Sequence, residues 1–405
     1  MRIRDVRALE ILDSRGNPTV QAEVALENGT RAKAQVPSGA STGRHEAPEL
    51  RDGDPGRYGG KGVLGAVRNV EELLAPLVRG LDADDQTGVD RRMLESGGGA
   101  RFGANAVLAV SCAAARAAAA AKGLPLWKHL ARGAECRVPV PMVNIISGGL
   151  HAGRNIEFQD FLVIPRGYAS TADALEAVVR VHGATGRLLR EMACVLTGVA
   201  DEGGWGPHLA SNEAAVAVLR QAIDRAGSRM DIALDVASTH FHEDGAYRLE
   251  GRMLDAAGLG ELLGGWVSRY GVTSIEDALA EDDWAGWTAL TRRLGESVKL
   301  VGDDLFTTNP ERLARGIREG AANSVLVKMN QIGTLTETFE VVRMARGAGY
   351  GVVVSARSGE TEDSFLADLA VACSADHIKI GSITRSERLA KYNRLLEIER
   401  FEIGE

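Results

Sequence analysis

The sequence predicts an α/β protein in which a (β/α)₈ barrel follows a smaller α+β domain. Its 405 residues exceed the length of one ordinary domain, which is about 100–200 residues. From about residue 141 onward, short apolar runs alternate with amphipathic helical stretches, as in parallel strands joined by helical crossovers. Seven or more such units in the remaining chain match the roughly 250 residues that a closed barrel needs. An open doubly wound sheet is the alternative.

The expected N-terminal domain covers residues 1–136 and mixes strands with helices. Residues Val20–Leu26 alternate like a strand, and Arg31–Val36 pairs with it across the turn at residues 27–29. A loop rich in Gly and Ser follows at residues 37–43. Helical patterns cover about residues 62–78 and 104–122.

Two prolines, Pro139 and Pro141, favour extended backbone and indicate the start of the barrel domain at residues 137–405. The apolar runs expected as barrel strands are Phe161–Ile164, Ile232–Val236, Val272–Asp277, Leu300–Leu305, Ser324–Met329, Gly351–Arg357 and His377–Ser382. The expected helices include Asp173–Leu196, Trp284–Leu294, Pro310–Glu319, Thr334–Arg346, Asp363–Ala372 and Arg385–Ile398.

Composition excludes several classes of protein. Apolar residues make up 45% and charged residues 25%, so the chain is neither disordered nor fibrous. A net charge of −8 argues against nucleic acid as a partner. The four cysteines form no CxxC pair, which is typical of a reducing cytoplasm rather than of a disulfide framework or a zinc site. The charged N-terminus does not resemble a signal peptide. The alanine-rich run at residues 106–121 is expected to be a buried helix, so no membrane partner is expected.

Charged side chains follow the predicted barrel strands at their C-terminal ends, where barrels of this kind place their chemistry. Asp235, Glu276 and Asp303 each come at the end of one of three successive strands. A single acid there is as readily a helix cap, but three in succession predict a site for a hard cation such as Mg²⁺. Asp277 and Asp304 are expected to support these ligands.

Two lysines, Lys328 and Lys379, end two later strands and suggest the reaction. Lysine acts as a base only when its pKa is lowered, which a neighbouring ammonium or metal can do. The matching chemistry is removal of a proton α to a carboxylate, with the negative charge held by a metal. The alternative is that each lysine forms a structural ion pair with an acid.

The chain resembles the enolase family along nearly its whole length. The segments that carry this resemblance are Ile11–Val20, Val36–Glu46, Ser147–Gly153, Asp201–Gly204, Ser274–Trp284, Gly302–Leu305, Lys328–Leu335, Ser358–Asp363 and Arg385–Lys391. The resemblance implies an enolase-type barrel with an N-terminal capping domain, a homodimer and a hydro-lyase that dehydrates a small phosphorylated or phosphonylated carboxylic acid with one or two Mg²⁺ ions. The use of a Lys or His base with Mg²⁺ is a known property of this superfamily.

The resemblance also implies a role for each matching residue. Asp235, Glu276 and Asp303 are similar to the ligands of the first Mg²⁺, and Ser41 to the loop residue that closes over the site and helps a second ion bind. Lys328 is similar to the α-proton base, Lys379 to the charge that binds the substrate carboxylate, and Glu202 to the acid that helps hydroxide leave. The residues implied in substrate binding are His151, Gln159, Arg357 and Ser358.

Two positions depart from the family pattern. Family members carry histidine where this chain has Ala356, and glutamate where it has Asp160 after Gln159. Both changes shorten side chains around the leaving hydroxyl and the phosphoryl group. We therefore expect a dehydratase with a bulkier substrate, for example one that forms carboxyphosphonoenolpyruvate in phosphonate antibiotic biosynthesis. A glycolytic enolase that makes phosphoenolpyruvate from 2-phosphoglycerate, and a non-catalytic binding or scaffold protein, are the alternatives.

Overall fold

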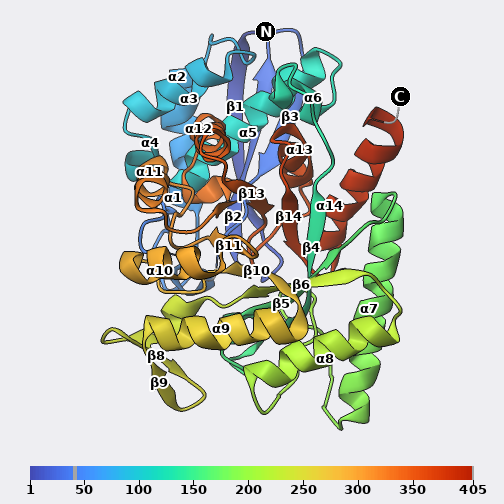
Figure 1. Ribbon diagram of the computed structural model, residues 1–405. Coiled ribbons are helices and arrows are strands. Elements are labelled where there is room, and N and C mark those ends of the chain that lie inside the picture. The colour runs from blue at the N-terminus through green and yellow to red at the C-terminus, as the bar shows by residue number, and fades with distance from the viewer. Residues whose placement is uncertain (40–42, 404–405) are drawn as a thin grey trace.

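The N-terminal residues form a small α+β unit that lies against one side of a closed barrel (Figure 1). The computed structural model describes residues 1–39 and 43–403. The N-terminal unit contains a three-stranded antiparallel sheet in the order β1-β2-β3. Its strands and α-helices are β1 (Ile3–Leu12), β2 (Pro18–Leu26), β3 (Arg31–Gln35), α1 (Leu64–Arg68), α2 (Ala75–Val78), α3 (Gln86–Glu95), α4 (Gly98–Phe102), α5 (Ala104–Ala121) and α6 (Leu126–Ala131).

The predicted hairpin is confirmed, because Gln21 on β2 pairs with Gln35 on β3 in antiparallel register. The predicted helix at 62–78 consists of α1, a wider π-helical turn at Asn69–Leu74 and α2. The strand β1 was not predicted, because its charged residues interrupt the apolar ones without a regular period of two, and most of its side chains are partly or fully exposed.

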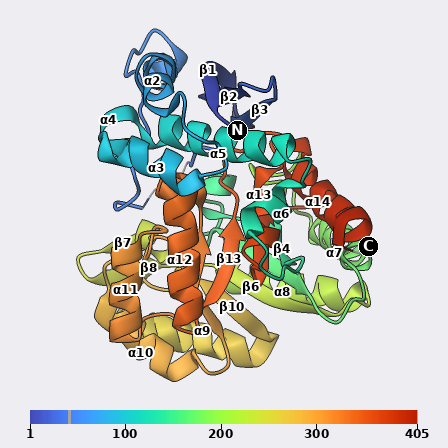
Figure 2. The same cartoon turned by 90° about the horizontal axis from the view of Figure 1, so that it is seen from above.

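Helix α5 is long and apolar enough to cross a membrane by composition alone, yet 83% of it is buried inside the fold. It packs against β2 and β3 on one side and contacts α12 of the barrel (Figure 2). Its many alanines let the sheet approach closely while the burial of apolar surface stabilises the contact. The prediction of a buried core helix is confirmed.

Eight strands close the barrel in the order β10-β11-β12-β13-β14-β4-β5-β6. Their bounds are β4 (Val140–Ser147), β5 (Asp160–Pro165), β6 (Met230–Asp235), β10 (Val272–Glu276), β11 (Lys299–Gly302), β12 (Ser324–Val327), β13 (Gly351–Ser355) and β14 (His377–Gly381). The expectation of parallel strands throughout is wrong for β5, which runs antiparallel to both β4 and β6. The connection from β4 to β5 is a short loop rather than a helical crossover, so β5 must reverse direction.

The barrel helices surround these strands (Figure 1). They are α7 (Thr171–Glu191), α8 (Asn212–Arg225), α9 (Ala256–Tyr270), α10 (Trp284–Leu294), α11 (Pro310–Glu319), α12 (Leu335–Gly347), α13 (Phe365–Ala372) and α14 (Ser386–Glu397). A small antiparallel sheet, β7 (His242–Glu243), β8 (Ala246–Leu249) and β9 (Arg252–Leu254), precedes α9. The predicted helix bounds agree within about two residues except at the end of α7, which stops at Glu191 instead of Leu196.

The barrel interior is filled by apolar side chains below the polar mouth. This layer consists of Met142, Leu162, Ile164, Ala233, Val301, Leu326 and Val353. Such a packed interior fixes the strand positions and leaves chemistry to the ends of the strands. The parallel strands carry their C-terminal ends to the same mouth at which reversed β5 begins, with Asp160 opposite Asp235.

Candidate active site

Three acids and two lysines meet at the barrel mouth. The acids lie at the C-terminal ends of three successive strands, β6, β10 and β11. Asp235 ends β6 and lies in register with Glu276 at the end of β10. The Lys379 Nζ atom, on β14 across the barrel, donates to Asp235 Oδ2 and to Glu276 Oε2, both at 2.7 Å. Lys328 follows β12 and forms an ion pair with Asp303. These five residues therefore meet at one mouth of the barrel, each at the end of a different strand.

Burial makes this acid cluster electrostatically costly. The pKa of Glu276 lies well above its ordinary value, because burial and the charge of Asp235 both oppose ionisation more than Lys379 favours it. Asp235 has a lowered pKa, since Lys379 outweighs the effect of burial. Buried carboxylate oxygens without a cysteine ligand form a donor set that fits Mg²⁺, and a divalent cation there would offset the repulsion.

Asp303 also belongs to a tight acid group with Asp277 and Asp304, whose oxygens lie within 4.8 Å of one another. Both oxygens of Asp277 already accept backbone N–H groups, those of Asp303 and Asp304, at 2.9 Å each. Asp277 holds a left-handed backbone with φ 42°, which aims its side chain at the β11 end. Asp277 therefore positions Asp303 rather than offering free ligand atoms.

Both lysines are paired with acids, as the structural alternative expected. Burial lowers the pKa of Lys328, but Asp303 raises it, and the net shift is upward. The pKa of Lys379 lies well above its ordinary value, because Asp235 and Glu276 outweigh burial. Both side chains are accordingly ammonium ions here, and the lowered lysine pKa expected from the sequence is not found. A proton-accepting Lys328 requires the charge of Asp303 to be engaged by another cation.

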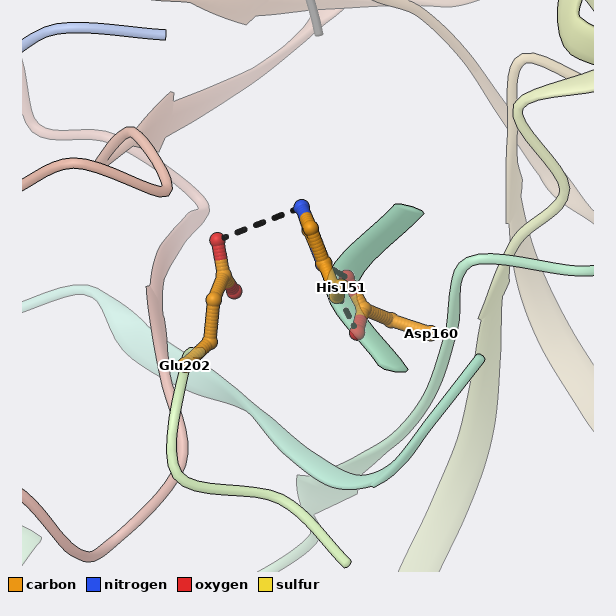
Figure 3. A group of neighbouring side chains, drawn as sticks. All are labelled: His151, Asp160 and Glu202. Atoms are coloured by element: carbon orange, nitrogen blue, oxygen red, sulfur yellow. Dashed lines mark hydrogen bonds and ion pairs between the residues drawn. The ribbon is translucent and has the colours of Figure 1, made fainter. Parts of the chain in front are cut away.

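On the opposite wall, His151 lies between two acids (Figure 3). Its Nδ1 atom is 3.2 Å from Asp160 Oδ2, and its Nε2 atom is 3.9 Å from Glu202 Oε1. Burial lowers the pKa of His151, but Asp160 and Glu202 raise it, to about 9 overall. The imidazole is therefore charged at neutral pH. Asp160 also accepts a hydrogen bond from Asn144, so it holds His151 instead of facing the pocket directly.

The remaining predicted substrate residues lie close by. The Gln159 Nε2 atom donates to Asp235 Oδ2 at 3.1 Å. Ala356, Arg357 and Ser358 follow β13 and line the same pocket, which has about 400 Å³ of empty volume. All of the predicted site residues that the structure describes thus lie at one mouth of the barrel. Ser41 lies outside the described residues.

Arg357 is held by groups that sequence reasoning did not single out. Its guanidinium forms two hydrogen bonds with the carboxylate of Glu46, at 3.0 and 3.1 Å, and one with Asn330 Oδ1 at 2.9 Å. Gln331 Nε2 donates to Asp303 Oδ1 at 2.9 Å. Glu46 and the Asn330-Gln331 pair lie inside segments that carry the family resemblance, and this was the signal available for them.

Ser38 and Gly39, in the loop that follows β3, reach the barrel mouth. A Cβ atom on Gly39 would lie 1.9 Å from Arg357 Nη2, so a larger residue here would displace the guanidinium from its present position. Ser38 and Gly359 exchange two backbone hydrogen bonds, at 2.7 and 2.9 Å. The N-terminal unit therefore packs directly against the segment that carries Arg357 and Ser358.

Two family models match the chain over almost all of its length. The enolase N-terminal domain matches residues 3–130, and the C-terminal TIM barrel domain of enolase matches residues 135–405. The chain belongs to the enolase family. It is accordingly a lyase of the hydro-lyase class, with an enolase-type barrel and N-terminal domain. Enolases act on small phosphorylated carboxylic acids and typically use Mg²⁺, which agrees with the acid groups found at the barrel mouth.

Proposed function

We propose that this enolase-family protein removes the α-proton of a 2-phosphoglycerate-like acid and then eliminates water to give an enolpyruvate product. The observation that carries the proposal is the gathering of Lys328, Lys379 and three buried acids at one mouth of the barrel, where the lysines pair with the acids. A cluster of this charge and composition suits abstraction of a weakly acidic proton next to a carboxylate.

Lys328 is the group proposed to take the α-proton, and Lys379 binds the substrate carboxylate and opposes its growing negative charge. Asp235, Glu276 and Asp303 would hold Mg²⁺, with Ser41 assigned to a second ion from the family pattern. The chemistry supplied by bound Mg²⁺ is stabilisation of the negative charge that develops on the substrate carboxylate. Lys379 is buried and Lys328 is mostly shielded from solvent, which strengthens these interactions.

The opposite wall is assigned to the leaving hydroxyl and to the phosphoryl group. Glu202 gives a proton to the departing hydroxide, while His151 and Gln159 orient the substrate. Asp160 keeps His151 charged and fixed, which is a positioning role within the catalytic set. Arg357 and Ser358 bind the phosphoryl oxygens, for which the two-pronged guanidinium is well suited. Glu46 must release Arg357 when a phosphoryl group takes its place.

The proposed substrate is bulkier than 2-phosphoglycerate, because Ala356 presents only a methyl group to the pocket where other enolases carry histidine. A 2-phosphoglycerate with a carboxylate on phosphorus would yield carboxyphosphonoenolpyruvate. This compound is an intermediate in the biosynthesis of phosphonate antibiotics. The family match alone is equally consistent with phosphoenolpyruvate formation from 2-phosphoglycerate. The retained lysines and acids argue against a non-catalytic protein.

We further propose that the protein is a cytoplasmic homodimer.

The test separates proton removal from dehydration. With Mg²⁺ and 2-phosphoglycerate in D₂O, we expect α-deuterium incorporation by NMR to exceed product formation, and Lys328→Ala to abolish incorporation. Lys299→Ala, which removes a lysine at the other end of β11, is the matched control and should exchange normally. Rapid formation of phosphoenolpyruvate would establish the glycolytic activity instead. Absence of exchange with 2-phosphoglycerate and with its carboxylated analogue would contradict any dehydratase function.

A further inference from the structure

Arg388, on α14, is a fully buried cation that the mechanism above does not use. Its side chain has no exposed surface, and its Nε atom lies 3.5 Å from Glu387 Oε1. Burial of a guanidinium is costly unless its N–H groups are bonded, and an apolar side chain of similar volume would fill the same space at lower cost. The reason for a cation at this position must therefore lie in the groups that its N–H donors bind.

The donors of Arg388 bind backbone carbonyl groups at the barrel mouth. Its Nη1 atom donates to Arg357 O at 2.7 Å and to Ile380 O at 3.0 Å, and its Nη2 atom donates to Ser358 O at 2.6 Å. Arg357 and Ser358 are the residues assigned to the phosphoryl group, and Ile380 directly follows Lys379 on β14. One side chain of α14 therefore holds two segments of the proposed active site.

These bonds decide which way the peptide groups beside the phosphoryl site point. A carbonyl oxygen carries partial negative charge and would repel an anion at close range. The carbonyl oxygens of Arg357 and Ser358 face Arg388 instead. In the opposite direction, the next N–H group, that of Gly359, donates to Ser38 O at 2.9 Å. The turn is thus held from two sides, with its carbonyl groups bound to a buried cation.

A second buried cation of α14 holds the rest of this turn. The Nζ atom of Lys391 donates to Thr361 O at 2.6 Å and lies 2.8 Å from Glu360 Oε2. The other oxygen of Glu360 accepts the N–H of Arg357 at 3.1 Å. Arg388 and Lys391 are three residues apart and so share one face of the helix. Residues 357–361 are therefore bound to that face.

We propose that Arg388 is a positioning residue for the phosphoryl group of the substrate. It turns the carbonyl oxygens of Arg357 and Ser358 away from the anion and fixes the turn that carries both side chains. This inference rests on the proposed function, which assigns the phosphoryl group to these two residues. Changes at Arg388 should weaken binding of the phosphoryl group more than they slow proton removal by Lys328, which follows a different strand.

The effect is expected to be selective because the two segments bound by Arg388 differ in their other contacts. Ile380 lies in β14, which pairs with β13 on one side and with β4 on the other. Loss of one hydrogen bond leaves that strand, and Lys379 with it, in place. Residues 357–361 lie beyond the end of β13 and depend on the bonds described above.

The experiment measures phosphate binding and proton removal separately. Arg388→Lys keeps the charge but loses the forked donor, and Arg388→Met keeps only the apolar stem. Phosphorus NMR titration should show that both variants bind inorganic phosphate about tenfold more weakly or worse, the scale of one lost charge-assisted hydrogen bond. In D₂O with Mg²⁺, half-maximal α-deuterium exchange by Arg388→Lys should need about tenfold more 2-phosphoglycerate, while the rate at saturation stays within about threefold.

Arg394 provides the matched control on the same helix. It donates to both oxygens of Asp368 at 3.0 and 2.8 Å, a contact of α14 with α13 instead of with the barrel mouth. Arg394→Lys should lower the melting temperature as Arg388→Lys does, yet leave phosphate binding unchanged. If Arg388→Met does not fold, Arg388→Lys alone decides the outcome.

Several results would overturn the inference: equal weakening of phosphate binding in Arg388→Lys and Arg394→Lys, unchanged phosphate binding in the folded Arg388 variants, or no phosphate binding by the unmodified protein. A fall in the saturating exchange rate as large as the loss of phosphate affinity would also overturn it. Failure of the dehydratase proposal has a different signature, because α-deuterium exchange would then be absent from every variant while the phosphate titrations still separate Arg388 from Arg394.

Discussion

At the scale of single residues, Ala356 decides how much room the pocket offers near the phosphoryl site. Its side chain is buried, and its N–H donates to Lys379 O at 2.8 Å, so the backbone position is fixed by the neighbouring strand. Replacement of this methyl group by an imidazole therefore fills pocket space rather than moving the chain. Two opposite effects on two substrates should follow.

We expect Ala356→His to lower kcat/KM for the carboxylated substrate and to raise the relative rate with 2-phosphoglycerate. The ratio of the two values should shift by about tenfold or more, as pocket-filling substitutions commonly cause. Steady-state assays with both substrates measure this ratio. Ala356→Ser is a control of similar size, for which little change is expected. Improved turnover of the bulkier substrate by the histidine variant would count against the role of Ala356.

Glu202 offers a second test at this scale, because acid catalysis and proton abstraction use different walls of the pocket. We expect Glu202→Gln to retain α-deuterium exchange and to slow dehydration by about 10²–10⁴-fold, the range for loss of a general acid. NMR follows the exchange, and ultraviolet absorbance follows the enol product. An equal loss of both rates would show that Glu202 acts before the two steps separate.

The positions of the acids and lysines were predictable from the sequence, because each follows an apolar strand at a known end. The hydrogen-bond and ion-pair partners of these site residues were less predictable from the sequence. The pairing of Glu46 with Arg357 joins residues more than 300 positions apart, and Gly39 lies against the same guanidinium. The upward pKa shift of Lys328 arises from an ion pair with Asp303, which no strand pattern specifies.

At the scale of elements, the strands with continuous apolar runs were located well, whereas β4 and the direction of β5 were not. Because of Pro139 and Pro141, the sequence alone predicts an extended boundary between domains at this segment. In the structure, Val140–Ser147 is the first barrel strand. Pro141 is tolerated because it is the second residue of β4, near the strand start, where its missing N–H disturbs the ladder least. The direction of a strand is set by the connection before it, and residues 148–159 carry no helical period that distinguishes a crossover from a hairpin.

Strand β14 begins with His377, whose ring lies 3.3 Å from Val140 O. Burial and the nearby Lys299 lower the pKa of His377 to about 4, below its ordinary value of 6.5. The unfolded chain therefore binds a proton more readily than the folded chain between these values. This group gives its full stability above pH 6.5, and that stability is lost as the pH falls toward 4.

We expect His377→Gln to flatten the dependence of the melting temperature on pH between 6.5 and 4, because glutamine keeps the hydrogen-bonding capacity without the titration. Thermal unfolding at closely spaced pH values measures this slope. Exposed His208, for which the same change should leave the slope as it is, serves as the control. An unchanged slope in the His377 variant would show that other groups govern acid sensitivity.

At the scale of the whole molecule, the N-terminal unit and the barrel are joined by a well-shielded ion pair. Arg116 on α5 donates to both oxygens of Asp363, at 2.6 and 2.9 Å, and Asp363 is buried. Asp363 also accepts the N–H of Gln35 at 2.9 Å. The ion pair thus links α5, β3 and the segment after β13 at one point.

We expect Arg116→Ala to lower the free energy of unfolding by on the order of 3 kcal/mol, because it leaves Asp363 buried without its cation. Urea denaturation measures the change. Arg180→Ala breaks an exposed pair with Glu176 on α7 and should cost less than about 1 kcal/mol. A loss in the first variant as small as in the second would mean that water reaches Asp363 readily.

The reversed direction of β5 has a consequence for how this scaffold can change its selectivity. The connection from Gly148 to Gln159 carries His151 and Gln159 in a stretch of twelve residues, all of it between two adjacent strands. Such a stretch could be exchanged as one cassette between relatives without disturbing the lysines and acids contributed by distant parts of the ring. A change of substrate would then require replacement of this one loop, while the lysines and acids that remove the proton stay in place.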